Sequence, residues 1–156
     1  MIEEKQWISS EVLFAAIAEQ LAAGRQAAFT VTGMSMWPFL CHGRDQVIVG
    51  RAERASLRRG DIVLYQTAEG RYILHRITKL GGDTFQTTGD GNFFRDPKMP
   101  FANIAARAEG VIRNGRTIAC SDWRWKMLSE VWMLLYPFRR GMFFVWFRVL
   151  RRWVRK

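Results

Sequence analysis

The feature that most constrains the fold is a succession of short apolar and β-branched runs, separated by glycine-containing turns, between residues 28 and 119. Such runs predict strands, which we expect at 28–32, 46–50, 61–66, 72–79, 84–88 and 109–113. Gly81-Gly82 separates two of the runs. Asn114-Gly115 joins the last run to Thr117-Ile118 as a hairpin, because both turn positions tolerate positive φ. The sequence therefore predicts a mainly β body.

A helix is expected before this body. The serines at 9–10 are suitable N-cap residues, Glu11 falls in the first turn, and apolar residues recur with helical spacing at positions 12, 13, 16, 17 and 21. Gly24 is a suitable end, because glycine readily adopts the left-handed conformation of a helix C-terminus. We predict a helix from about 11 to 23.

The charge is distributed unevenly along the 156 residues. The whole chain carries a net charge of +10, but residues 1–122 hold 15 basic and 13 acidic side chains. Residues 123–156 hold nine basic side chains, one acidic side chain and five of the seven Trp. We therefore divide the chain into an N-terminal helix (1–26), a β-rich domain (27–122) and a basic, Trp-rich helical tail (123–156).

The tail allows three interpretations. Apolar residues with helical spacing precede Pro137, and an aromatic run follows over 142–147. Basic residues surround this run, namely Arg139, Arg140, Arg148, Arg151, Arg152, Arg155 and Lys156. An aromatic stretch flanked by Arg is typical of a helix in the interface of an anionic membrane. The alternatives are two helices packed on the body, and a nucleic-acid surface where aromatic rings stack on bases.

The sequence predicts neither a metal site nor another cofactor. Soft ligands come only from Cys41, His42, His75 and Cys120, and no CxxC or HxxxH spacing occurs. Two cysteines do not make a disulfide framework, so they fit a reducing compartment as well as an oxidising one. The acidic stretch 1–5 leads into no uninterrupted apolar segment, and no window of about 18 apolar residues occurs, so we expect neither a secretory signal nor a transmembrane helix.

The segment 31–40, Val-Thr-Gly-Met-Ser-Met-Trp-Pro-Phe-Leu, carries the strongest local signal. A small residue two positions before Ser35 and Pro38 three positions after it predict a turn that presents the hydroxyl near converging main-chain amides. A serine hydroxyl becomes a nucleophile only with a base within hydrogen-bond reach. The alternative is an ordinary turn residue at Ser35 and a core aromatic at Trp37.

A candidate base and candidate acids follow in two further segments. The strand expected over 72–79 places His75 on the same face as Ile73 and Ile77, and apolar neighbours favour the neutral imidazole that can accept a proton. The segment 88–97, Thr-Gly-Asp-Gly-Asn-Phe-Phe-Arg-Asp-Pro, offers carboxylates that could orient an imidazole. The alternatives are a structural histidine and a glycine loop whose Asp and Asn bond their own backbone.

Taken in order, five short motifs resemble those of signal peptidase I and its relatives, the serine peptidases that share a β-rich fold with the self-cleaving SOS-type repressors. The motifs are Gly33–Pro38 (GxSMxP), Gly43–Asp45, Arg59–Val63, His75-Arg76, and Gly89–Asn92 with Asp96. The match runs from about residue 29 to residue 113. The common bacterial enzymes have Lys before the Arg of the fourth motif, whereas the endoplasmic-reticulum and archaeal type has His, so this chain is similar to the His type.

The resemblance implies the β-rich catalytic fold of that superfamily and a serine endopeptidase that cleaves a peptide or precursor protein through an acyl-enzyme, without a cofactor. It makes Ser35 the nucleophile, His75 the general base and Asp96 the acid that orients the base. Asp90 becomes a second, loop-shaping acid. The oxyanion hole would use the Ser35 amide with a neighbouring amide or Thr32, and the residues that shape the site would be Thr32, Gly33, Met34, Met36 and Pro38.

The sequence departs from this family in two places. Family members normally enter the membrane through an N-terminal helix, but the helix expected here is short and carries Glu11, Glu19 and Gln20. The loop 89–92 reads Gly-Asp-Gly-Asn where the His type usually has Gly-Asp-Asn-Asn. In addition, Arg95 beside Asp96 offers a competing partner for that carboxylate.

Two other functions use the same features. A non-catalytic relative could hold peptides in the cleft at a membrane surface, and a self-cleaving regulator could bind nucleic acid. The single N-terminal helix is too little for a helix-turn-helix, so we do not expect a nucleic-acid partner. The Arg-rich tail favours the cytoplasmic leaflet. We therefore expect a peripheral, membrane-associated enzyme on the cytoplasmic face, acting on a cytosolic precursor. The sequence does not indicate the oligomeric state.

Overall fold

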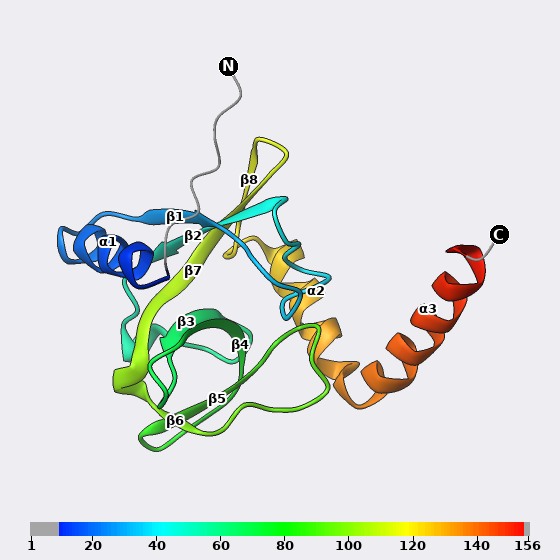
Figure 1. The fold of residues 1–156 in the computed structure, drawn as a ribbon. Helices are drawn as coiled ribbons and strands as arrows, with labels where there is room; N and C mark the ends of the chain where they lie inside the picture. The colour runs from blue at the N-terminus through cyan, green and yellow to red at the C-terminus, as the bar shows by residue number, and fades with distance from the viewer. Residues whose placement is uncertain (1–9, 155–156) are drawn as a thin grey trace.

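The computed structural model describes residues 10–154, which form a curled antiparallel sheet flanked by helices (Figure 1). The strands in this range are β1 (Ala27–Thr30), β2 (Asp45–Gly50), β3 (Ile62–Gln66), β4 (Tyr72–Gly81), β5 (Thr84–Thr88), β6 (Met99–Pro100), β7 (Ile104–Arg113) and β8 (Arg116–Ala119). They follow the order β1-β2-β7-β3-β4-β5-β6, and β8 pairs with β7. The prediction of a mainly β body is confirmed.

Helices lie before and after the sheet. The α-helices are α1 (Ser10–Ala22), α2 (Trp123–Leu134) and α3 (Arg139–Val154), and the short 3-10 turns are η1 (Arg54–Ser56), η2 (Phe101–Asn103) and η3 (Tyr136–Phe138). α1 ends as predicted, because Gly24 has a φ of +73° and the Arg25 N–H donates to Gln20 O. The N-cap candidate Ser9, the stretch 1–5 and residues 155–156 lie outside the described residues.

The predicted hairpin is present, and two strand segments were not predicted. Asn114 and Gly115 have φ of 51° and 73°, as a two-residue turn between β7 and β8 requires. β6 has only two residues, one of them Pro, and residues 104–108 at the start of β7 are rich in alanine. Ala106 pairs with β3 and Ala108 with β2, so neighbours on both sides supply the strand conformation that the alanines themselves do not favour.

Two cores lie on opposite faces of the sheet. Alternate residues of β3 point to each, so that Ile62 and Leu64 enter one core while Val63 and Tyr65 enter the other. The larger core packs α1, the loop after β1 and α2 against the sheet. This two-sided burial explains why β3 reads as a continuous apolar run.

The loop from β1 to β2 is fixed to the sheet at Asp45. This carboxylate has no exposed surface, and it accepts hydrogen bonds from the Cys41 N–H (2.8 Å) and from Arg113 (2.9 and 3.0 Å). Arg113 also donates to Phe39 O at 2.6 Å. The buried Asp45 carboxylate, paired with Arg44 and Arg113, therefore anchors the second half of a loop that has no regular secondary structure.

One face of α2 packs on the body. Trp125, Ser129 and Met133 are buried on that face, and Asp122 caps the helix by accepting from the Arg124 N–H at 2.8 Å. For this face, the interpretation of tail helices packed on the body agrees with the structure. α3 extends away from the sheet (Figure 1). Within residues 10–154, none of the helices combines the length and apolar character needed to cross a bilayer.

Candidate active site

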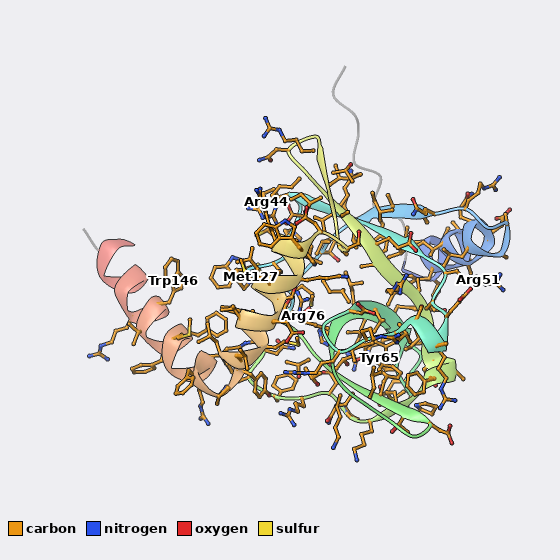
Figure 2. All side chains as sticks on the ribbon, turned by 180° about the vertical axis from the view of Figure 1, so that it is seen from behind. Arg44, Arg51, Tyr65, Arg76, Met127 and Trp146 are labelled. Carbon is orange, nitrogen blue, oxygen red and sulfur yellow. The ribbon has the colours of Figure 1, made fainter. Side chains whose placement is uncertain are left out.

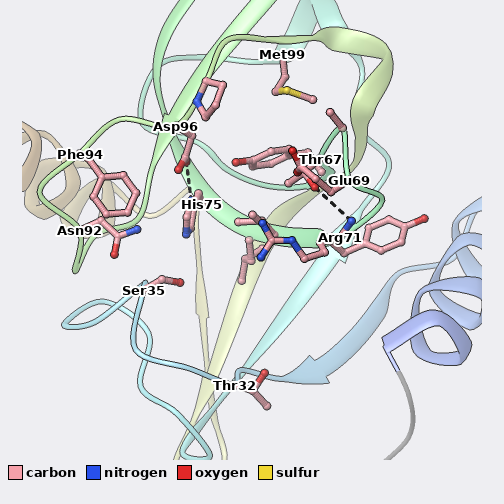
Figure 3. Close-up of a pocket in the computed structure, with 16 residues that line it drawn as sticks. Thr32, Ser35, Thr67, Glu69, Arg71, His75, Asn92, Phe94, Asp96 and Met99 are labelled. Atoms are coloured by element: carbon pink, nitrogen blue, oxygen red, sulfur yellow. Dashed lines mark hydrogen bonds and ion pairs between the residues drawn. The ribbon is translucent and has the colours of Figure 1, made fainter.

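A pocket of about 620 Å³ opens between the loop after β1, the start of β4 and the loop after β5 (Figure 3). Ser35 lines it from the first segment, His75 from the second and Asp96 from the third. The fold therefore brings the three predicted catalytic residues to one cavity, although they come from separate parts of the chain.

The Ser35 turn is held from both ends. It begins at Gly33, whose φ of +82° lies in the left-handed region that favours glycine. The Gly33 N–H donates to His42 Nδ1 at 2.9 Å. Met36 is 2% exposed and belongs to the larger core, so the residue after the serine anchors the turn to the body. Ser35 itself is half-buried beside the pocket.

The loop between β5 and β6 packs its main chain directly on this turn. The Gly91 N–H donates to Ser35 O at 2.8 Å. A methyl group would lie 2.5 Å from Ser35 O at Gly89 and 2.6 Å from Met34 O at Gly91, distances that no side chain tolerates. Gly91, the residue that departs from the usual motif of the His type, is therefore required here by the close approach of the two loops.

A short hydrogen bond in the pocket joins His75 to Asp96. His75 Nδ1 lies 2.6 Å from Asp96 Oδ2, and the two residues are 5% and 7% exposed. The Asp96 N–H donates to Thr87 O at 2.9 Å, which fixes the loop beside β5. Arg95 does not compete for the carboxylate, because its guanidinium lies over the Tyr136 ring, 5.4 Å from the centroid.

Both features expected around His75 meet at its ring. The sequence pattern places apolar neighbours beside it, the resemblance adds Asp96 as an orienting acid, and in the structure Asp96 contacts Nδ1. Because a carboxylate accepts only from Nδ1–H, it selects the tautomer whose Nε2 is free to accept a proton, and it stabilises the imidazolium that then forms. The structure thus supplies both the orientation of His75 and a countercharge.

Two residues that were not predicted support Asp96. Thr87 Oγ1 lies 2.7 Å from Asp96 Oδ2 and 3.0 Å from Tyr65 Oη. The single Thr87 hydroxyl hydrogen therefore goes to the carboxylate, and Thr87 accepts from Tyr65.

Burial raises the pKa of Tyr65 to about 12, so its hydroxyl stays a neutral donor. Burial alone would raise the pKa of Asp96, but hydrogen bonds from His75 and Thr87 outweigh it and lower that pKa.

Asp90 has a structural role and does not line the pocket. Its two oxygens accept from Arg76 Nε and Nη2 at 2.8 and 2.7 Å, and both residues are 1% exposed. Arg76 also donates to Ser129 Oγ of α2 at 2.9 Å, and Figure 2 shows it between α2 and the sheet. Asp90 O accepts from Trp132 Nε1 and Arg139 Nη1. The interpretation as a loop-shaping acid therefore agrees with this geometry.

Arg139 corrects one expectation for the tail. By sequence, Arg139 is one of the basic residues that surround the aromatic run, but in the structure it is 2% exposed. Its guanidinium lies over the Trp132 ring, 4.7 Å from the centroid, and donates to Trp132 O at 2.8 Å. Arg139 is thus a buried link between α2 and α3 rather than a surface cation.

The remaining predicted residues surround Ser35 unequally. Thr32 is exposed and lines the pocket, Met34 is 62% exposed and does not line it, and Pro38 is half-buried within the turn. In the described part of the chain, the Ser35 N–H and Oγ and the His75 Nε2 make no hydrogen bond to another protein group. A potential nucleophile, an acceptor and a main-chain donor are therefore all available to a bound molecule.

Residues 10–154 contain no group of three His, Cys, Asp or Glu side chains arranged to hold a metal ion. Comparison with known proteins adds no identification: no protein-family model matches this sequence, and no curated protein matches it.

Proposed function

We propose that this chain is a serine endopeptidase of the signal-peptidase type, with the catalytic fold of that superfamily and with Ser35 as nucleophile, His75 as base and Asp96 as the acid that orients it. The observation that carries the proposal is the buried His75–Asp96 pair, whose free ring nitrogen points to the side of the pocket where Ser35 lies (Figure 3). A histidine with only a structural role would not need a carboxylate and an open cavity on its two sides.

The chemistry follows from these groups. Ser35 Oγ attacks the carbonyl carbon of the peptide bond while its proton passes to His75 Nε2, and Asp96 stabilises the imidazolium. The C–N bond then breaks, and the imidazolium gives its proton to the leaving amine. A water molecule, deprotonated by the neutral His75, attacks the acyl-enzyme, and the proton returns to Ser35 as the acid product leaves.

The Ser35 N–H is the donor for the oxyanion. It belongs to the nucleophile's own residue and makes no hydrogen bond within the described chain, so it can bind the oxygen that becomes charged. Thr32 lines the same pocket and can supply a second donor through its hydroxyl.

A peptide can bind here as an additional strand. Residues 72–75 of β4 pair with β3 on one side, whereas β5 pairs with β4 only from residue 76 onward. The other edge of 72–75 is therefore open beside the pocket. Main-chain hydrogen bonds to such an edge hold a peptide irrespective of its sequence, and the pocket then selects its side chains.

A second function, non-catalytic peptide binding, is favoured by one observation. No hydrogen bond joins Ser35 Oγ to His75 among the described residues. In enzymes without substrate this contact is often long and shortens when substrate binds. The two functions therefore differ in what Ser35 does once a peptide occupies the pocket.

The test is cleavage of a diverse peptide pool by the full chain, read by mass spectrometry. We expect products with the wild type that are lost with Ser35→Ala and with His75→Ala, and that persist with the control Ser121→Ala, a change at an exposed serine. Circular dichroism checks that each variant is folded. Binding of pool peptides without any product, equally by wild type and Ser35→Ala, would favour the non-catalytic function.

A further inference from the structure

The exposed apolar side chains are concentrated on one part of the molecule. Among the described side chains, every large apolar residue that is strongly exposed, apart from Val12 on α1, lies on α2, η3, α3 or the loops that hold Met34, Phe93 and Phe94. Scattered exposed apolar residues are ordinary, whereas a concentrated group marks a docking surface. We call the exposed side of residues 123–148 the α2–α3 surface.

Helical spacing gathers these residues on the side opposite the buried contacts of α2. Met127, Val131 and Leu134 lie one turn apart, and each is about half exposed or more. On α3, Val145 and Trp146 are 60% and 52% exposed, and Trp146 projects on the side of the helix that faces α2 (Figure 2). Both helices therefore present apolar side chains that are about half exposed or more, and the Trp146 ring also lies 6.1 Å from the Trp37 ring of the Ser35 turn.

The charge on the same helices has one sign. Arg124, Lys126, Arg140 and Arg148 are exposed, and the only acidic residue in 123–156 is Glu130. Glu130 lies 3.9 Å from Arg59 of the body. An anionic bilayer matches this surface because Leu, Val, Met and Trp enter the boundary of the acyl chains while Arg meets the lipid phosphates.

Other occupants fit this surface less well. A second copy would bring two strongly basic surfaces together, and like charges repel. A nucleic acid would meet the basic charge and the aromatic rings, but it offers nothing to the exposed Val131, Leu134 and Val145, which bases do not stack on.

Buried contacts tie this surface to the loops of the pocket. The Phe143 ring lies 5.8 Å from the Trp37 ring and 5.5 Å from the Phe93 ring, so α3 contacts both the Ser35 turn and the loop that holds Asp96. Arg139 Nη1 donates to Asp90 O in the same loop. Phe94, next to Phe93, lines the pocket.

We propose that the α2–α3 surface binds the anionic surface of a lipid bilayer, lies in its interface, and so holds the mouth of the pocket beside the membrane. The inference goes beyond the proposed peptidase function and does not depend on it, because the surface, its charge and its contacts are separate from the chemistry of Ser35.

The experiment is flotation of the full chain with vesicles of phosphatidylcholine alone and of phosphatidylcholine mixed with phosphatidylglycerol. We expect strong binding to the mixed vesicles, weak binding to the neutral ones, and release by salt. The double variant Arg140→Glu with Arg148→Glu should weaken partition about 30-fold or more, since each basic residue near an anionic surface contributes roughly fivefold. Leu134→Ser with Val145→Ser should weaken it about tenfold.

Matched controls carry the same changes on the body. Arg25→Glu with Arg116→Glu alters the net charge equally, and Val12→Ser removes an exposed apolar side chain from α1, so neither should reduce partition by more than about twofold. Circular dichroism checks the fold of each variant. The proposal is overturned if the wild type floats with neither vesicle, or if the body charge variant loses as much binding as Arg140→Glu with Arg148→Glu. Tighter binding to duplex nucleic acid than to vesicles, or a dimer abolished by Leu134→Ser with Val145→Ser, would also overturn it.

Discussion

His75 Nδ1 lies 2.6 Å from Asp96 Oδ2 in a site where both residues are almost fully buried. A charge-assisted hydrogen bond at this distance fixes the ring, and burial keeps water from weakening it. The other ring nitrogen lines an open pocket that Ser35 also lines. One contact between two residues thus sets the tautomer, the orientation and the countercharge of the proposed base.

Replacing Asp96 by Asn should abolish most of the activity while the chain stays folded. An amide at this position can donate to Nδ1 and select the wrong tautomer, so we expect kcat to fall roughly 10³-fold or more. The measurement is the rate of cleavage of a peptide found in the pool. Asp83→Asn, at an exposed acid, is the control and should leave kcat unchanged. A normal kcat for Asp96→Asn would show that the pair is structural.

Replacing Thr87 by Val should change the pH profile of the enzyme. The variant keeps the shape of the residue but removes a donor to Asp96, so the pKa of Asp96 rises toward its ordinary value. The loss of kcat/KM that follows protonation of Asp96 then begins at higher pH, and kcat falls about tenfold because a hydrogen bond to a charged group is lost. Thr117→Val on β8 is the control. A fall in kcat with no earlier loss of kcat/KM in acid would contradict this role.

Replacing Asp90 by Asn should act mainly on stability. The change leaves the Arg76 guanidinium buried without its countercharge, which costs about 3–5 kcal/mol in free energy of unfolding. Urea denaturation followed by circular dichroism measures this loss, with Glu69→Gln on an exposed turn as the control. A loss below about 1 kcal/mol would show that Arg76 finds other partners.

Acid should lower the free energy of unfolding, and protonation of Asp45 should account for part of this loss. Burial opposes ionisation of Asp45, but hydrogen bonds from Arg44 and Arg113 outweigh it and hold the pKa of Asp45 well below its usual range. A carboxyl group whose pKa is lower in the folded chain stabilises it above the unfolded pKa of about 4, and this stabilisation is lost as pH falls through the folded value.

The free energy of unfolding should therefore fall as the pH drops below about 4. Asp45→Asn should lower stability at pH 7 and flatten the dependence on acid pH, as measured by urea midpoints between pH 7 and pH 3. An unchanged acid slope in this variant would assign the effect to other carboxylates.

The strands could be predicted where local chemistry determines them. The β3 run, the Asn114-Gly115 turn and the glycine at the end of α1 follow from propensity and backbone freedom, which act over a few residues. The first half of β7 could not be predicted, because its alanines become a strand only through pairing with β2 and β3. β6 could not be predicted either, because two residues are too few to show the alternation of apolar and polar side chains that indicates a strand. It forms through two residue pairs with β5.

The site was predictable as a set of segments, but its supporting contacts were not. Short sequence motifs identify Ser35, His75 and Asp96 one by one. The contact between Thr87 and Asp96 depends instead on how a loop packs on β5, which no motif shows. One signal was available: Thr87 lies two residues after Phe85 in β5, and alternation in a strand places both side chains on the same, buried face. The burial of Arg139 had no such signal, because it depends on where α2 and α3 meet the loop at Asp90.

The most direct test of the proposed function is detection of an acyl group on Ser35. The full chain is mixed with an activated ester of a peptide that it cleaves, quenched in acid, digested and analysed by mass spectrometry. We predict the acyl mass on the fragment that contains Ser35, its loss in Ser35→Ala, and its persistence in the control Ser121→Ala. Cleavage without any adduct on Ser35, or an adduct that remains in Ser35→Ala, would contradict the assignment of the nucleophile.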